Sequence, residues 1–147
     1  RSTPKPSWAA SDVYKRQQPR GAEHILTGAI LCFPASWTLA EKFMHPLSRI
    51  HVPVPSYDAN ITKRVQRLFN GIQVGRPLWR CNYLHYDAPD LFHPRMEADP
   101  RSGVSEGAGP YIRSERQTLC RLPKTGAVVF GIHTFVLRNQ TFQADKA

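Results

Sequence analysis

The sequence has no long hydrophobic run and few cysteines, and these absences exclude several classes of protein. No apolar stretch is long enough to span a bilayer, and the mean hydropathy is −0.43, so no membrane anchor is expected. Cys32, Cys81 and Cys120 are widely spaced, odd in number and lack C-x-x-C pairing. This argues against a disulfide framework or a structural zinc site. A reducing compartment, the cytoplasm, is the expected location.

Acidic residues are also in short supply. The chain carries 20 Lys and Arg against 11 Asp and Glu, a net charge of +9. Such an excess can attract nucleic acid, and an RNA-binding α+β domain would predict salt-dependent binding. However, the sequence has no basic block interleaved with aromatics and no nucleic-acid-binding motif. We therefore expect neither a nucleic acid nor a membrane as partner.

The length of 147 residues suits one domain. Residues 1–17 (RSTPKPSWAASDVYKRQ) have no apolar core and no periodicity, and they look like adapter or leader sequence, so we set them apart from the fold. Residues 24–138 are expected to form the domain. Within it, residues 87–110 are rich in Pro, Gly and acidic residues and predict a long loop. Residues 139–147 are expected to be a tail.

A β-hairpin is the clearest feature of the sequence. Residues 113–122 alternate charged and uncharged side chains, residues 123–126 (PKTG) supply a turn, and residues 127–136 are β-branched and aromatic. Because side chains alternate along a strand, the even positions 128–136 form one apolar face. This pattern places the hairpin at the centre of the fold.

The first strand of this hairpin is unusually rich in ionisable groups. By alternation Arg113, Glu115, Gln117 and Arg121 share one face, and Arg116 lies on the other with Thr118 and Cys120. An exposed sheet face would explain them. A polar wall over a ligand pocket would explain them as well.

The remaining segments predict an α+β fold. Residues 25–33 and 78–86 read as strands, residues 47–50 as a helical turn, and residues 58–70 as a helix capped by Asp58. Ser36 is expected to cap a further short helix that starts at Trp37 or Thr38 and ends at Pro46. The buried stripe of the 58–70 helix should contain Ile61, Val65, Leu68, Phe69 and Ile72. We expect an antiparallel sheet with helices packed on one side, and a ferredoxin-like domain is the alternative.

Three blocks resemble one known family. RSERQTLCRLPKTGAVVF resembles the R-x-E-R-Q-T-L-x-R-L-P-x-T-x-A motif of the haem-dependent oxidative N-demethylase alpha subunits. CFPASWTLAEKFMHPLSRIHVPVPSY is similar to their C-F-P-S-x-W-x-L-x-x-K-x-G-x-P-L-x-x-I-H-x-P-V-P-x-Y block, and PLWRCNYLHYDAPDLFHP to their R-x-N-W-x-I-x-x-x-P-x-L-F-x-P block. The resemblance covers residues 28–136. Met44 stands where the family usually has glycine, Tyr83 where it has tryptophan, and His133 where arginine is common.

The resemblance implies a haem-binding PAS-like domain, and an incomplete one, because the family's proteins are longer. It implies haem b, O₂ and a small secondary amine such as dimethylamine. Electrons would come from NADPH through FMN and 2Fe-2S centres, which with tetrahydrofolate would belong to partner subunits, since no Rossmann motif or cysteine cluster occurs here. A non-catalytic haem-binding or sensory PAS-like module is the alternative.

The resemblance also points to site residues. Among the histidines (His24, His45, His51, His85, His93, His133) and the three cysteines, His51 is the expected haem axial ligand, because it belongs to the I-H-x-P-V-P block and Pro53 and Pro55 restrict its surroundings. The alternative for His51 is a helix-terminal histidine bonded to backbone.

Four further residues complete this expected site. Glu115 is expected to attract the amine cation, and Arg113 to lie beside it in the pocket. Arg80 and Arg116 are expected to bind the cofactor. The alternatives for Arg116 are a buried ion pair and a tie between the sheet and the 87–110 loop.

Overall fold

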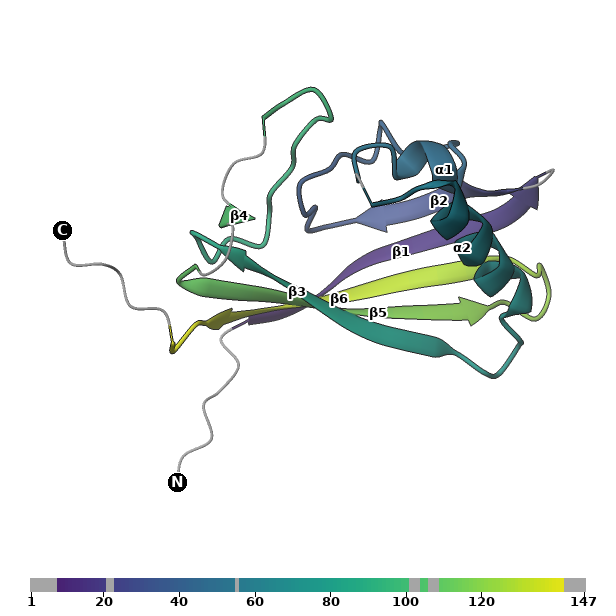
Figure 1. Cartoon of the computed structure of the whole chain (residues 1–147). Coiled ribbons are helices and arrows are strands. Elements are labelled where there is room, and N and C mark those ends of the chain that lie inside the picture. Colours follow the sequence, from purple (N-terminus) through teal and green to yellow (C-terminus); the bar gives the residue numbers. More distant parts are fainter. Residues whose placement is uncertain (1–7, 21–22, 55, 101–103, 106–108, 142–147) are drawn as a thin grey trace.

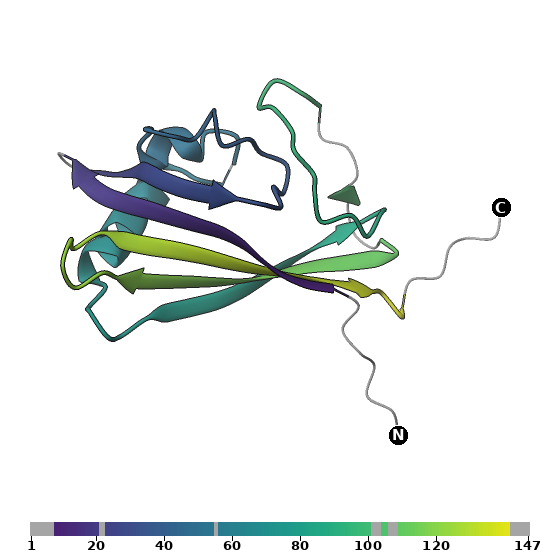
Figure 2. The same cartoon turned by 180° about the vertical axis from the view of Figure 1, so that it is seen from behind.

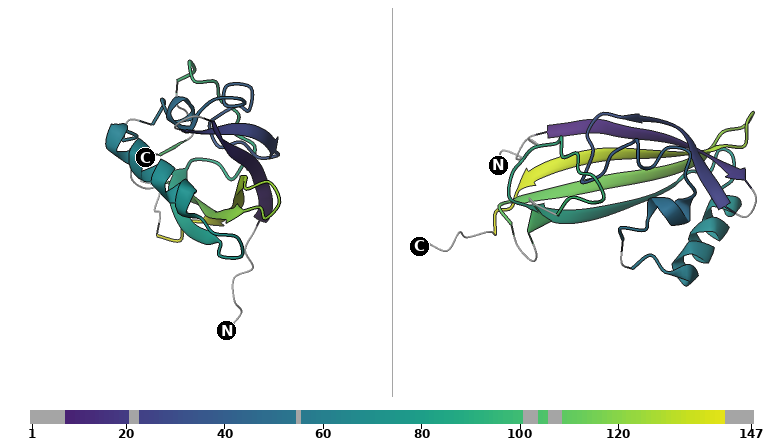
Figure 3. Two further views of the ribbon diagram at one scale, coloured as in Figure 1. Left: turned by 90° about the vertical axis from the view of Figure 1, so that its right-hand side faces the viewer. Right: turned by 90° about the horizontal axis from the view of Figure 1, so that it is seen from above.

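The described part of the chain folds into an antiparallel sheet of six strands in the order β2-β1-β6-β5-β3-β4 (Figure 1). The computed structural model describes residues 8–20, 23–54, 56–100, 104–105 and 109–141. The strands are β1 (Trp8–Arg20), β2 (Glu23–Leu31), β3 (Leu78–Tyr86), β4 (Val104–Ser105), β5 (Tyr111–Arg121) and β6 (Val128–Arg138). The helices α1 (Leu47–Ile50) and α2 (Ala59–Gly71) lie on one side of the sheet (Figure 3).

This arrangement confirms the predicted α+β class with helices on one side. The PAS-like character stays a prediction. The rear view shows the other face of the sheet without a helix over it (Figure 2). The site must therefore be sought on the face that the helices and the connecting loops cover.

The predicted hairpin is confirmed as β5 and β6. Arg121 pairs with Val128 next to the turn and Tyr111 with Arg138 at the far end. Val128, Ile132, Thr134 and Val136 are buried, as the even-numbered face predicts. The alternation of side chains therefore predicted correctly which face of β6 points inward.

The N-terminal segment differs from the sequence-based expectation. Residues 1–17 were set apart from the fold, yet β1 pairs with β2 from Val13 and with β6 from Trp8. A strand pairs through its backbone N–H and C=O groups, so a segment without hydrophobic periodicity can still complete a sheet. Residues 1–7, and residues 142–147 of the expected tail, lie outside the described residues.

Helix α2 begins where the sequence predicts. The Asp58 side chain accepts a hydrogen bond from the Ile61 backbone N–H at 2.8 Å, the interaction of an N-cap. Its buried face contains Phe69 and Gln66, while Leu68 is 45% exposed, so the predicted stripe was wrong at that position. A polar partner on β2 explains the change, because Gln66 accepts hydrogen bonds from the buried His24.

The core below α2 is small. Its buried members are Leu47 of α1, Phe69, Ile72 and Val128, with Val65 and Leu119 packed against them. This cluster fixes both helices to one end of the β5–β6 hairpin. The rest of the inward sheet face is left to line a pocket.

The predicted helix after Ser36 does not form. Ser36 has φ +60°, a left-handed conformation that cannot begin a helix as an extended N-cap does, and turns follow to Met44 at φ +61°. Thr38 uses its hydroxyl to bind Glu41 instead.

Within the predicted long loop at residues 87–110, the described residues 87–100 form no helix or strand, and β4 follows them. Its first part is held by backbone contacts: His93 pairs with Ala35, its N–H donates to the Pro34 carbonyl at 2.9 Å, and Ser36 N–H donates to the His93 carbonyl at 2.7 Å. The Phe92 side chain adds little to this attachment, because it is 63% exposed. The loop therefore runs beside the turns that follow β2, on the side of the sheet that holds the helices (Figure 1).

Candidate functional site

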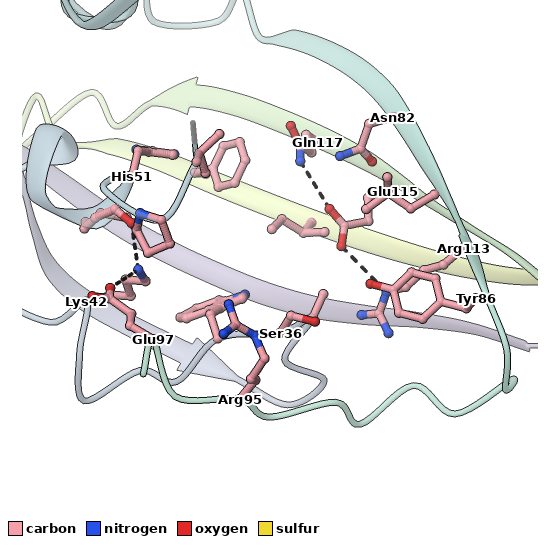
Figure 4. Close-up of a pocket in the computed structure, with 18 of the residues that line it drawn as sticks. Ser36, Lys42, His51, Asn82, Tyr86, Arg95, Glu97, Arg113, Glu115 and Gln117 are labelled. Carbon is pink, nitrogen blue, oxygen red and sulfur yellow. Dashed lines mark hydrogen bonds and ion pairs between the residues drawn. The ribbon is translucent and has the colours of Figure 1, made fainter. Parts of the chain in front are cut away.

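A pocket of about 330 Å³ lies between the inward sheet face and the segments that cover it (Figure 4). This volume is at the lower end of the range of small-molecule and cofactor sites. Residues from β3, β5, β6, α1, the turns after β2 and the long loop line it: Ala35, Ser36, Trp37, Lys42, Ile50, His51, Pro53, Val54, Arg80, Asn82, Leu84, Tyr86, Arg95, Glu97, Arg113, Glu115, Gln117, Phe130 and Ile132.

A row of polar side chains crosses the sheet wall of this pocket. Arg80 Nε of β3 donates to Gln117 Oε1 of β5 at 2.8 Å. Gln117 Nε2 donates in turn to Glu115 Oε2 at 3.2 Å, and Glu115 Oε1 lies 3.7 Å from Arg113 Nε. Gln117 thus joins Arg80 to the carboxylate, and the row presents charges of both signs to the pocket.

Arg113 is the most deeply buried member of the row, with 3% of its surface exposed. Its Nη1 donates to the Leu91 carbonyl at 2.8 Å and its Nη2 to the Phe33 carbonyl at 3.2 Å. The guanidinium carbon also lies 5.8 Å from the centre of the Tyr86 ring. Arg113 therefore connects β5 to the end of β2 and to the long loop, and it orients Glu115 at the same time.

His51 lines the pocket from the end of α1. Its Nδ1 lies 2.8 Å from the Leu47 carbonyl oxygen, and because a carbonyl only accepts, Nδ1 carries the proton. In the neutral imidazole the lone pair then belongs to Nε2. The ring stacks on Tyr57, with centroids 4.3 Å apart and an interplanar angle of 14°. Burial, followed by repulsion from Glu23, raises the pKa of Tyr57, so this neighbour of His51 is an uncharged phenol at neutral pH.

The side of the pocket opposite the sheet carries an ion-pair cluster. Lys42, only 5% exposed, donates from Nζ to Glu97 Oε1 at 2.6 Å and to the Ile50 carbonyl at 2.7 Å. Arg49 Nη1 binds both carboxylate oxygens of Glu97, at 3.1 and 2.9 Å. The hydrogen bonds from Lys42 and then Arg49 hold the pKa of Glu97 below its ordinary value. This cluster fixes the backbone just before His51.

Glu41 strengthens the same attachment of the long loop. Its Oε1 accepts from the Glu97 backbone N–H at 2.9 Å, and its Oε2 accepts from the Thr38 hydroxyl at 2.6 Å. These two hydrogen bonds, the one from Thr38 first, lower the pKa of Glu41. The carboxylates of Glu41 and Glu97 therefore both hold the long loop beside the pocket.

The fold gathers four of the five expected site residues on one pocket: His51, Arg80, Arg113 and Glu115. Arg116 is the exception. It is exposed and pairs in register with Cys81 and His133 on the other face of the sheet, because strand alternation turns it away from its neighbours Glu115 and Gln117. The position of Arg116 does not support the expected contact between Arg116 and a cofactor in the pocket.

Sequence reasoning missed Lys42, Arg95 and Glu97 as lining residues, and it placed Gln117 on the polar face of the strand without giving it a role in the site. Lys42 and Gln117 occupy lettered positions in the motifs quoted above, so a signal for them was present. Arg95 and Glu97 belong to the long loop, and nothing in its composition indicates that it reaches the pocket. Glu97 is held at the pocket by tertiary contacts with Lys42 and Arg49, and Arg95 by hydrogen bonds to carbonyls of its own loop.

The fold and the pocket define an α+β domain with a pocket that is walled by paired charges and lined by an oriented imidazole. The sequence matches the family described as haem-dependent oxidative N-demethylase, alpha subunit-like, over residues 10–147. The chain belongs to this family. Among the described residues no helix is long and apolar enough to cross a membrane.

Proposed function

We propose that this chain supplies the haem-binding site of an oxidative N-demethylase alpha subunit that acts on a small secondary amine of the dimethylamine type. The observation that carries the proposal is the convergence of His51, Glu115, Arg113 and Arg80 on one pocket from two sides. O₂ would be the oxidant, and the reducing equivalents would come from NADPH through flavin and iron–sulfur partner subunits. Family membership supports the haem and the alpha-subunit role.

The donor set of the pocket fits a haem. A histidine that ligates a metal commonly donates its other ring N–H to a backbone carbonyl, as His51 does to Leu47. Apolar contacts for a macrocycle are available from Leu84, Phe130 and Ile132. The lining cations Lys42, Arg80, Arg95 and Arg113 outnumber the lining carboxylates Glu97 and Glu115, which suits a ligand that carries two propionates. His51 would hold the iron, and Arg80 would bind the periphery.

When bound, the haem would supply the site for O₂ chemistry that amino-acid side chains lack. The chain itself would bind and orient the amine. The Glu115 carboxylate would accept a hydrogen bond from the ammonium N–H of the substrate, and Arg113 and Gln117 would keep that carboxylate in place. The apolar side chains Phe130 and Ile132 would contact the methyl groups and exclude water from them.

Absorption spectra test the haem assignment. The 147-residue chain, reconstituted with haemin and freed of unbound haemin by gel filtration, should retain a Soret band that His51→Ala abolishes. His45→Ala is the matched control, because His45 is exposed on the same segment and does not line the pocket. An unchanged spectrum in His51→Ala would eliminate His51 as the ligand, and the absence of any Soret band in the parent chain would overturn the proposed function.

The substrate assignment has its own test. Dimethylamine should shift the Soret band of the haem-loaded chain, and Glu115→Gln should weaken that response by about tenfold or more, since a charge-assisted hydrogen bond to the ammonium is lost. Acetate, a small anion of similar size, should give no such shift. An equal response of Glu115→Gln to dimethylamine would remove Glu115 from the substrate site.

The Arg113–Glu115 ion pair favours a second candidate function, a non-catalytic haem-binding or sensory module. A carboxylate that already faces a guanidinium at 3.7 Å attracts an external cation less strongly than an uncompensated one. Such a module would bind haem through His51 and give no amine-dependent spectral shift. The dimethylamine titration therefore separates the two candidates.

A further inference from the structure

Arg95 occupies an unusual position among the cations of the pocket. Its Nη1 donates to two carbonyls of its own loop, those of Met96 at 3.0 Å and Asp99 at 2.6 Å, so the guanidinium is held in place before any ligand arrives. In Figure 4 the side chain rises from the loop toward Ser36 and the middle of the pocket. Arg95 is thus a prepositioned cation rather than a mobile surface group.

The Nε atom of Arg95 is buried, and no hydrogen-bond partner for it exists among the described residues. A buried donor without an acceptor loses its hydration and regains nothing, which is unfavourable. Because Nε is inaccessible, Arg95 lines the pocket through its other atoms, and a ligand would meet its positive charge there rather than this N–H group.

Charge pairing shows which kind of acceptor is needed. Lys42 and Arg113, two of the other lining cations, face the carboxylates of Glu97 and Glu115. No ion pair of Arg95 with a carboxylate occurs within the part of the chain that the structure describes, and its recorded hydrogen bonds go to neutral carbonyls. The positive charge of Arg95 is therefore not balanced by its described neighbours, and an anionic oxygen would serve it better than a neutral one.

We propose that Arg95 is the anchor for a carboxylate of the pocket ligand, and that this carboxylate is a propionate of haem. The inference rests on the proposed function for the identity of the ligand. It assigns a binding role to the long loop, which the sequence did not indicate. Through Arg95 and the Lys42–Glu97 pair, the loop would contribute both to the affinity for the ligand and to the shape of the site.

Haemin and haemin dimethyl ester together test the anchor, because the ester keeps the macrocycle and iron but carries no carboxylate. Affinities are measured by absorption titration of the 147-residue chain and of Arg95→Met. The variant should bind haemin about 10- to 100-fold more weakly than the parent chain does, the loss expected for one charge-assisted hydrogen bond. Its affinity for the dimethyl ester should change less than about threefold.

Two further variants keep the result interpretable. Arg95→Lys retains the charge without the guanidinium geometry and should lose less affinity for haemin than Arg95→Met. Arg76→Met removes an exposed arginine that lies outside the pocket lining and should bind both porphyrins as the parent chain does. Circular dichroism of each variant checks that the sheet is retained.

The outcomes separate the two proposals. If the parent chain binds haemin and Arg95→Met binds it equally well, the anchor is refuted while the haem site stands. Equal losses of affinity for haemin and for its dimethyl ester would also refute the anchor, since the carboxylate would then not be what Arg95 recognises. Failure of the parent chain to bind either porphyrin would refute the haem site itself.

Discussion

The imidazole of His51 lies nearly parallel to the ring of Tyr57, 4.3 Å away between centroids. Together with the hydrogen bond between Nδ1 and the Leu47 carbonyl, this stacking fixes both the plane and the tautomer of His51. A ligand-binding imidazole gains affinity from such preorganisation, because less rotational freedom remains to be lost on binding. Tyr57 is therefore a positioning residue of the site.

Replacing Tyr57 with leucine should weaken haem binding. An aromatic stack contributes about 0.5–1.5 kcal/mol, so the dissociation constant for haemin should rise by roughly 2- to 10-fold. Absorption titration measures this change. Tyr57→Phe keeps the ring and should bind haemin like the parent chain, and equal weakening in Tyr57→Phe and Tyr57→Leu would contradict the stacking argument.

Glu97→Gln should change how stability depends on pH. Lys42 and then Arg49 lower the pKa of Glu97 in the folded chain, so the carboxylate contributes stability above its unfolded pKa of about 4.5, and that contribution is lost as pH falls through the lower folded value. The glutamine side chain does not titrate, so its contribution to stability does not depend on pH in this way. The parent chain should be more stable than the variant at pH 7, and the difference should shrink below about pH 4.5.

Urea denaturation at a series of pH values gives the free energies of unfolding for this comparison. Asp90→Asn is the control, because Asp90 is an exposed acid on the same loop and its replacement should change stability little at any pH. A difference between the parent chain and Glu97→Gln that stays constant from pH 7 to pH 3 would refute the ion-pair contribution.

Arg121→Met should destabilise the whole domain. Arg121 donates to the carbonyls of Ile72 at 2.5 Å, Gly126 at 2.6 Å, and Phe69 and Asn70 at the end of α2 at 2.6 and 3.2 Å. These bonds satisfy helix carbonyls that lack partners within the helix and attach α2 to the hairpin turn. The free energy of unfolding should fall by about 2–4 kcal/mol.

Arg67→Met is the matched control for Arg121, because Arg67 is an exposed arginine on α2. Its substitution should change the free energy of unfolding by less than about 0.5 kcal/mol. Comparable losses for the two variants, measured by urea denaturation, would show that the capping contacts of Arg121 contribute no special stability.

Met44→Gly should stabilise the chain. Met44 has φ +61° and is 46% exposed, so it bears the cost of a left-handed conformation while burying little surface. Glycine adopts this conformation without a steric penalty, although the unfolded chain of the variant is more flexible. The net gain should be about 0.5–1 kcal/mol in thermal or urea unfolding. Phe43→Gly, at a neighbouring exposed position without positive φ, should destabilise, and stabilisation by both would contradict the backbone argument.

Several elements could be predicted from the sequence because their signals are local. The alternation in β5 placed Arg113, Glu115 and Gln117 on one face and Arg116 on the other, since the period of two follows from strand geometry alone. Asp58 marked the start of α2, because an N-cap side chain bonds within one turn. At position 44, by contrast, the family pattern has glycine and the structure has a positive φ, where the sequence was interpreted as a short helix ending at Pro46.

Other features depended on contacts between segments far apart in the chain. The buried face of α2 turned toward Gln66 because His24 on β2 offered a hydrogen bond, which a helical hydrophobic pattern cannot anticipate. The place of β1 in the sheet follows from its backbone pairing with β2 and β6, which its sequence did not indicate. Both are tertiary effects that override local preference.

The sequence by itself determined the hairpin, the faces of its strands and the family to which the chain belongs. Only the tertiary structure decided that His51 and the β5 carboxylate line the same pocket, and that the long loop adds Arg95 and Glu97 to it. The physical reason is that periodicity and capping arise from neighbouring residues, whereas a pocket is formed where distant segments pack and pair their charges.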